Sequence, residues 1–298
     1  MKKVLILTVT AGNGHNSCSK ALKEKLIYLA SEKGEQIDVK IVDLLKSYTN
    51  PVKVWIADGG YNFAIGKLPQ AYEWFYNLYK EKDPNDRYKC ASQGYAVSIS
   101  EGLYKEINSF KPDVIFSAHF YGAMAITDLK LIGKIPCKTL VTSLDYVNSP
   151  FWEACNGVDY FNIPNEDFAD ECIYEGFKRE QLLTFGIPVR EQFLSVCDKQ
   201  KTREELGLDK DTFTFMVMFG GGYWNGGLKI FEDLVSVIPK DKKVQIIMIN
   251  GKNKQGYDYI AKKTFPQNIK VVNVGFTDKV DLYMSASDLM LSKVGGLS

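Results

Sequence analysis

The residue of this sequence best placed to move a proton is His15, at the start of the first predicted helix. A continuous aliphatic and β-branched run at residues 4–10 is typical of a buried parallel strand, and Gly12 and Gly14 lie in the turn after it. The helical spacing of the apolar residues that follow places His15 at a helix N-terminus. Because the pKa of histidine lies near neutrality, such a residue suits general base catalysis. The alternative is that His15 only neighbours the helix cap and has no chemical role.

The other histidine, His119, follows another predicted buried strand, at residues 113–117. Asp145 ends the next predicted strand, at residues 138–145. Ligands of open α/β sheets bind outside the carboxyl ends of the strands, so we expect these side chains at one functional edge. For His119 itself the pattern favours a buried, hydrogen-bonded role.

The spacing Gly12-x-Gly14 could also begin the dinucleotide-binding fingerprint G-x-G-x-x-G. Ser17 occupies the position of the third glycine, so that fingerprint is incomplete. A nucleotide-binding oxidoreductase is therefore the weaker alternative.

A second strand and glycine turn open the C-terminal part of the sequence. Apolar residues at 212–219 lead into a stretch, 220–227, in which five of eight residues are glycine. Glycines there would let the backbone approach a phosphate or a sugar closely, whereas the alternative is a merely flexible loop. Counting from this strand, four strands are predicted near 213–219, 244–250, 270–274 and 289–292, in the sheet order 3-2-1-4.

The sequence ends at Ser298, shortly after the last predicted strand and the pair Gly295 and Gly296. A doubly wound domain normally continues with a helix and further strands. We therefore expect the second domain to be incomplete within these residues.

Aromatic residues and lysines gather in the segment 50–104, which interrupts the strand–helix alternation. Trp55, Trp74, Phe75 and Tyr79 are the rings most suited to a membrane interface, where lysines meet anionic lipid. The alternative is a helical insertion that packs on its own domain, since some of these aromatics must be core.

The composition narrows the class of protein. A net charge of +1 gives no indication of nucleic-acid binding. Six cysteines without a C-x-x-C pair, and no apparent signal peptide, are typical of reduced thiols in the cytoplasm. With two histidines and no paired cysteines we expect no metal site. No apolar run reaches the length of a membrane span.

Several motifs recur in a characteristic order along the chain. They are Gly12-Asn13-Gly14-His15, the strand at 113–115 leading to His119, Asp145 with Pro150-Phe151-Trp152, Phe185-Gly186-Ile187-Pro188-Val189, Gly251-Lys252-Asn253, Gly275-Phe276, and Ser292-Lys293-Val294-Gly295-Gly296. In this order the sequence resembles the diacylglycerol glycosyltransferases of glycosyltransferase family 28, the plant monogalactosyldiacylglycerol synthases and bacterial processive glucosyltransferases. The resemblance implies a GT-B fold, in which two Rossmann-like domains face each other across a cleft. It also implies transfer without a metal or cofactor, with a UDP-sugar as co-substrate.

The resemblance assigns roles to individual residues. His15 matches the general base and Asp145 the acidic residue at a strand end. The acceptor or cleft residues would be Gly12, Asn13, Gly14, His119 and Trp152. The donor-binding residues would be Gly220, Gly221, Gly222, Gly251, Asn253, Phe276, Lys293, Gly295 and Gly296.

The sequence departs from the family pattern at a few positions. Many relatives have histidine where this chain has Ser149, and some have it at Asn165; Val294 replaces a common proline. The family's donor site continues beyond Gly296 with a helix that carries a glutamate. We therefore expect these 298 residues alone to bind a UDP-sugar poorly.

Together these observations predict an α/β protein with a lipid-acceptor domain at 1–190 and an incomplete nucleotide-sugar-binding domain at 191–298. The expected reaction is inverting transfer of a hexose from a UDP-sugar to diacylglycerol or a glycolipid, at the inner, cytoplasmic face of an anionic membrane. The alternatives are a non-catalytic remnant and a UDP-N-acetylglucosamine-type transferase that acts on another lipid.

Overall fold

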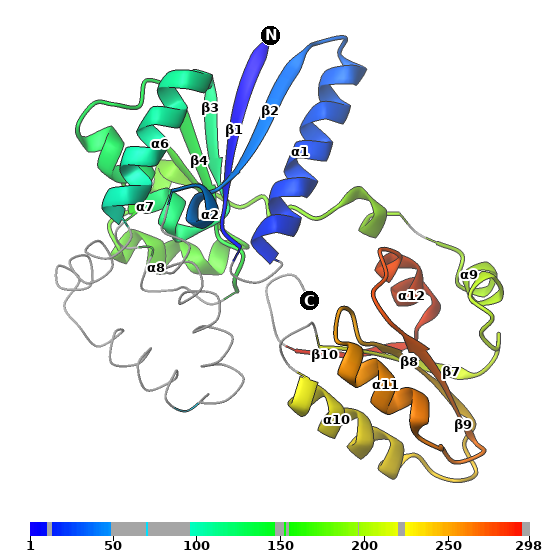
Figure 1. The fold of residues 1–298 in the computed structure, drawn as a ribbon. Coiled ribbons are helices and arrows are strands. Elements are labelled where there is room, and N and C mark those ends of the chain that lie inside the picture. The colour runs from blue at the N-terminus through cyan, green and yellow to red at the C-terminus, as the bar shows by residue number, and fades with distance from the viewer. Residues whose placement is uncertain are drawn as a thin grey trace. The chain divides into compact units, whose positions relative to one another are not determined.

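The structure is a computed structural model that describes residues 1–10, 14–48, 70, 96–146, 152, 155–195, 197–219 and 224–293. Contacts within the chain separate two compact units, Met1–Glu191 and Gln192–Gly296. Each unit contains a parallel sheet with its own helices (Figure 1). The chain is therefore an α/β protein, as the sequence predicts.

The sheet of the first unit has the strand order β2-β1-β3-β4-β5-β6, and all neighbouring strands are parallel. Its strands are β1 (Lys2–Thr8), β2 (Ile37–Asp43), β3 (Val114–Ser117), β4 (Lys138–Thr142), β5 (Tyr160–Asn162) and β6 (Leu182–Leu183). The described helices of this unit are α1 (Gly14–Glu32), α2 (Leu44–Tyr48), α6 (Ala96–Phe110), α7 (Phe120–Leu131) and α8 (Ala169–Tyr174), with single 3-10 turns at Glu166–Phe168 and Arg179–Gln181; a third turn, Glu191–Phe193, lies at the boundary between the units.

Both faces of this sheet are covered, which explains why β1 is apolar without alternation. Leu5 and Leu7 lie in the core cluster on the side of α6 and α7, whereas Val4 and Ile6 lie in the cluster with Cys18 of α1. In Figure 1, α1 covers one face and α6 and α7 the other. This layering brings the N-termini of α1 and α7 to the carboxyl ends of β1 and β3.

Helix α6 begins within the last residues of the aromatic-rich segment 50–104. Ile99, Leu103 and Ile107 recur every four residues and are buried in the core against the sheet, so α6 is a layer of the unit itself. The membrane residues expected from sequence, Trp55, Trp74, Phe75 and Tyr79, lie outside the described residues. In the part of the chain that the structure describes, no helix combines the length and the hydropathy needed to cross a bilayer.

The second unit contains a four-stranded parallel sheet in the order β10-β7-β8-β9. Its elements are α9 (Lys199–Glu205), β7 (Phe213–Met218), α10 (Trp224–Val237), β8 (Val244–Ile249), α11 (Lys254–Lys262), β9 (Ile269–Val274), α12 (Val280–Ala286) and β10 (Leu289–Ser292). Read from the other edge, the order is third, second, first and fourth strand along the chain. The predicted order 3-2-1-4 is therefore confirmed.

Candidate active site

The two histidines meet at the carboxyl edge of the first sheet. His15 is the second residue of α1, directly after β1 and its turn, and His119 caps the N-terminus of α7, directly after β3. Because β1 and β3 are neighbours, their ends bring the two imidazole rings together, with centroids 4.5 Å apart and planes at 64°. The edge-to-face contact confirms that both histidines lie at one edge of the sheet.

His15 is oriented by a backbone carbonyl. Its Nδ1 lies 2.6 Å from the carbonyl oxygen of Ala118, the last residue before the α7 cap. A carbonyl oxygen only accepts, so Nδ1 carries the hydrogen and, in the neutral ring, Nε2 keeps its lone pair. Burial lowers the pKa of His15, and this effect exceeds the opposing effects of the Ala118 carbonyl and the Asp145 charge. His15 is therefore neutral at pH 7 and can accept a proton at Nε2.

His119 is held in a different way. It is 5% exposed, and its Nδ1 accepts a hydrogen bond of 3.1 Å from the backbone N–H of Tyr121. This bond satisfies one of the free N–H groups in the first turn of α7. Burial holds the pKa of His119 well below its usual range, and the neighbouring His15 lowers it further. The expectation that His119 is buried and hydrogen-bonded is confirmed.

Polar residues at the ends of β1 and β2 fix the start of α1. The hydroxyl of Thr8 donates to Oδ1 of Asn16 at 3.0 Å, and Nδ2 of Asn16 donates to the hydroxyl of Thr10 at 3.3 Å. The Thr10 hydroxyl in turn donates to the carboxylate of Asp43 at the end of β2. Asn16 directly follows His15, so this network also positions the imidazole. In the sequence, the only signal of this network is that Thr8 and Asp43 each stand near the end of a predicted strand.

The remaining first-unit residues of the predicted site divide into two groups. Asp145 is exposed beyond β4, and its charge acts on His15. Trp152 is 4% exposed and packs on Phe161 at 4.8 Å between ring centroids, a position that favours core packing over contact with an acceptor. Gly14 begins α1, whereas Gly12 and Asn13 lie outside the described residues.

In the second unit, predicted donor residues follow β8 and β9. Gly251 has φ +57°, in the left-handed region that favours glycine. Asn253 caps α11, its Oδ1 accepting from the N–H of Gly256 at 2.9 Å. Phe276 is 70% exposed, with the ammonium of Lys252 5.6 Å from its ring centroid. Gly251, Asn253 and Phe276 therefore occupy loops at the carboxyl edge of this sheet.

The remaining predicted donor-binding residues are Lys293 and five glycines. Lys293 is exposed directly after β10. The remaining glycines of the predicted donor site, Gly220, Gly221, Gly222, Gly295 and Gly296, lie outside the described residues.

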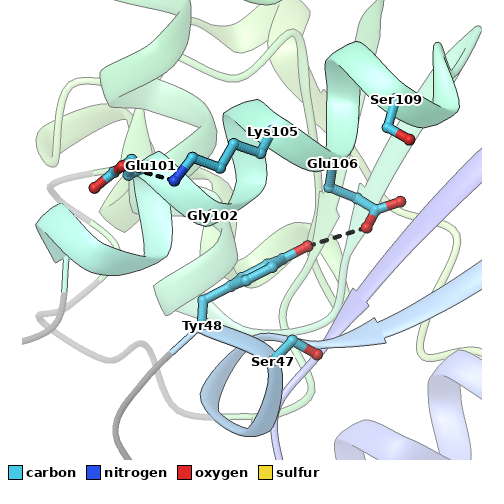
Figure 2. Close-up of a pocket in the computed structure, with 7 residues that line it drawn as sticks. All are labelled: Ser47, Tyr48, Glu101, Gly102, Lys105, Glu106 and Ser109. Atoms are coloured by element: carbon cyan, nitrogen blue, oxygen red, sulfur yellow. Dashed lines mark hydrogen bonds and ion pairs between the residues drawn. The ribbon is translucent and has the colours of Figure 1, made fainter.

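A separate pocket of about 480 Å³ lies between α2 and α6 of the first unit (Figure 2). In Figure 2 the hydroxyl of Tyr48 points to the carboxylate of Glu106, at 3.4 Å, and Lys105 pairs with Glu101 at 2.8 Å. A Cβ at Gly102 would lie 2.4 Å from the Tyr48 ring, so glycine permits this packing. The residues lining the pocket are Ser47, Tyr48, Glu101, Gly102, Lys105, Glu106 and Ser109, and the list includes none of the predicted site residues.

Among the residues that the structure describes, no group of three or more histidine, cysteine, aspartate or glutamate side chains could hold a metal ion. The structure brings together the imidazoles of His15 and His119 with the charge of Asp145, and neutral imidazoles can take part in proton transfer.

Two doubly wound parallel α/β units in one chain define the GT-B class of fold, and solved structures support this assignment. MurG of Acinetobacter baumannii matches with a TM-score of 0.52 at 11% identity, over 100% of this chain and 74% of that one. HepE of Anabaena, in complex with UDP and glucose, matches with a TM-score of 0.51 at 14% identity, over 97% of this chain and 73% of that one. At these identities the likeness shows the fold.

The family follows from the sequence. The model of the monogalactosyldiacylglycerol (MGDG) synthase family matches residues 15–189, which is more than half of the chain. The chain belongs to this family, as its resemblance predicted.

Two curated relatives show how much of the family's length the chain spans. A processive diacylglycerol beta-glucosyltransferase of Staphylococcus epidermidis is 26% identical over 304 residues, covering 100% of this chain and 72% of that protein. Monogalactosyldiacylglycerol synthase 2 of Arabidopsis thaliana, a chloroplastic protein, is 26% identical over 306 residues, covering 99% of this chain. The chain spans 62% of the length of the Arabidopsis relative.

Proposed function

We propose that the protein transfers a hexose from a UDP-sugar to diacylglycerol or a related glycolipid, with His15 as the general base. The observation that carries the proposal is the hydrogen bond from Nδ1 of His15 to the Ala118 carbonyl, 2.6 Å long. It places the free lone pair on Nε2, and burial keeps the ring neutral at physiological pH. The names of the family and of both relatives concern synthesis of glycosyl diacylglycerols, which supports the substrate class.

The proposed step is a direct displacement. Nε2 of His15 takes the proton from the acceptor hydroxyl while the hydroxyl oxygen attacks the anomeric carbon of the sugar. The bond between that carbon and the phosphate oxygen breaks, and UDP leaves with the electron pair. Attack opposite the leaving group inverts the anomeric configuration. The charge of Asp145 then stabilises the imidazolium that forms, because it favours the protonated ring.

The leaving diphosphate needs positive partial charge but, on this proposal, no metal or cofactor. Backbone N–H groups of glycine turns and helix N-termini supply such charge in many phosphate sites. We assign the contact with the diphosphate to two glycine-containing segments, Gly220 to Gly222 and Gly295 to Gly296. We place the nucleotide among four further residues: Gly251, Asn253, Phe276 and Lys293. The positive φ of Gly251 and the exposed ring of Phe276 support the assignment in the second unit.

The lipid acceptor requires the enzyme to work at a membrane. We propose peripheral binding to the anionic, cytoplasmic face through the aromatic and lysine residues around Trp55, Trp74, Phe75 and Tyr79. Rings at headgroup level beside lysines are the sequence feature that supports this proposal.

An assay with the full-length protein tests the function. Vesicles containing diacylglycerol and anionic lipid are incubated with radiolabelled UDP-glucose, UDP-galactose or UDP-N-acetylglucosamine, and lipid-extractable label is measured. We expect a glycosyl diacylglycerol from one of the two hexose donors, with equimolar UDP. Label from UDP-N-acetylglucosamine alone, or no labelled lipid with any donor, would contradict the proposal.

A further inference from the structure

The two imidazoles of the site hold opposite tautomers. A carbonyl oxygen accepts from Nδ1 of His15, so that ring carries its hydrogen on Nδ1. A backbone N–H donates to Nδ1 of His119, so the neutral His119 carries its hydrogen on Nε2. Within the described residues, neither Nε2 atom has a hydrogen-bond partner. One ring therefore offers a lone pair at Nε2 and the other an N–H at Nε2, and the centroids of the two rings are 4.5 Å apart.

We propose that His119 is a second residue of the acceptor site, whose Nε2–H donates to the oxygen of the hydroxyl that His15 deprotonates. The observation that supports a shared contact is the proximity of the two imidazole rings. Hydrogen bonds of about 2.9 Å allow a shared oxygen to bridge nitrogens up to about 5.8 Å apart. The two ring centroids are 4.5 Å apart, edge to face.

This role of His119 rests on the proposed function. It accounts for the hydrogen and both lone pairs of the acceptor hydroxyl. Its hydrogen goes to Nε2 of His15, one lone pair accepts from His119, and the other lone pair forms the bond to the anomeric carbon. His119 keeps its own hydrogen throughout, because it donates without transferring a proton. As the hydroxyl loses its proton, the negative charge on oxygen strengthens the bond from His119, so the donor acts mainly in the transition state.

A purely structural role for His119 is the competing explanation, because its Nδ1 also caps α7. Two substitutions separate the roles. Oδ1 of asparagine lies as many bonds from Cα as Nδ1 of histidine, so His119→Asn retains the cap acceptor but has no donor at the Nε2 position. Nε2 of glutamine lies as many bonds from Cα as Nε2 of histidine, so His119→Gln retains the donor and loses the cap.

The proposal predicts that the more stable of the two variants, His119→Asn, has the lower turnover, and that the less stable one, His119→Gln, has the higher turnover. His119→Asn is expected to unfold like the parent but to lose about 10²-fold in kcat, as when one oxyanion donor is removed. His119→Gln is expected to be less stable yet to stay within about tenfold of the parent kcat. Asp198→Ala removes the cap of α9 in the second unit and is the control for cap loss without an effect on turnover. Equal turnover of the two His119 variants, or faster turnover of His119→Asn, would overturn the proposal.

An independent measurement needs no sugar transfer. The sequence contains two histidines, so long-range ¹H–¹⁵N spectra of the uniformly ¹⁵N-labelled protein show two imidazoles, and no residue-specific labelling is needed. We expect one ring protonated at Nδ1, lost in His15→Ala, and one at Nε2, lost in His119→Gln. Two rings in the same tautomer would overturn the inference, whereas a parent protein without transferase activity would count against the proposed function.

Discussion

The hydrogen-bond network at the start of α1 should contribute measurably to stability, and Asn16→Ala tests it. The substitution removes two hydrogen bonds, from Thr8 at 3.0 Å and to Thr10 at 3.3 Å. Each contributes about 1 kcal/mol, and the Thr8 hydroxyl, 2% exposed, would be left without a partner at a further cost of about 1 kcal/mol. Alanine offsets roughly 0.6 kcal/mol through its higher helix propensity. The net loss is therefore about 2 kcal/mol for the first unit.

A double-mutant cycle with Thr8→Val makes this prediction specific. Valine has nearly the shape of threonine and suits a strand, so the double variant leaves no orphaned hydroxyl at position 8. We expect the double variant to lose about 2 kcal/mol less than the sum of the single losses, because both single variants lose the Thr8–Asn16 bond and only Asn16→Ala leaves an orphaned hydroxyl. Unfolding in urea is monitored by amide exchange in β1 and α1. These elements report on the first unit alone, and the two units can unfold in separate transitions. Additivity within about 0.3 kcal/mol would refute the coupling.

Three further predictions concern different parts of the molecule. Because burial lowers the pKa of His15 and the base must be neutral, kcat/KM should be constant at neutral pH and fall on acidification with a midpoint below the usual 6.5; a midpoint above 6.5 would contradict this. Gly102→Val should destabilise the first unit by about 1–3 kcal/mol in urea unfolding, because its Cβ would lie 2.4 Å from the Tyr48 ring, and unchanged stability would show that the ring moves freely. Sedimentation with vesicles should rise with anionic lipid, fall with salt and weaken in the double variant Trp74→Ala/Phe75→Ala; unchanged sedimentation would assign these rings to the core.

The sequence predicted those features that depend on local pattern. The apolar run before His15 identified β1 as a buried parallel strand, and the structure shows why: residues 4 and 6 face one helical layer, and residues 5 and 7 the other. Strand-end positions were enough to bring His15 and His119 to one edge. The order of the second sheet followed from the usual winding of such domains.

Features that depend on tertiary contacts could not be predicted in this way. Trp152 lies in a motif of the family, but its burial against Phe161 depends on β5, which follows later in the chain. The tautomer of His15 depends on the Ala118 carbonyl, which lies 103 residues away in sequence. The link from Asn16 to Asp43 through Thr10 likewise exists only because β1 and β2 are parallel neighbours.

The most direct test of the proposed chemistry is the turnover of His15→Ala in the full-length protein. Loss of a general base should lower kcat by about 10²- to 10⁴-fold, because the acceptor hydroxyl then has no group to take its proton. Binding of the UDP-sugar, measured by calorimetric titration, should remain nearly unchanged, since we place the donor residues in the second unit. A His15→Ala variant that transfers sugar at close to the parent rate, with the same donor affinity, would show that His15 is not the base.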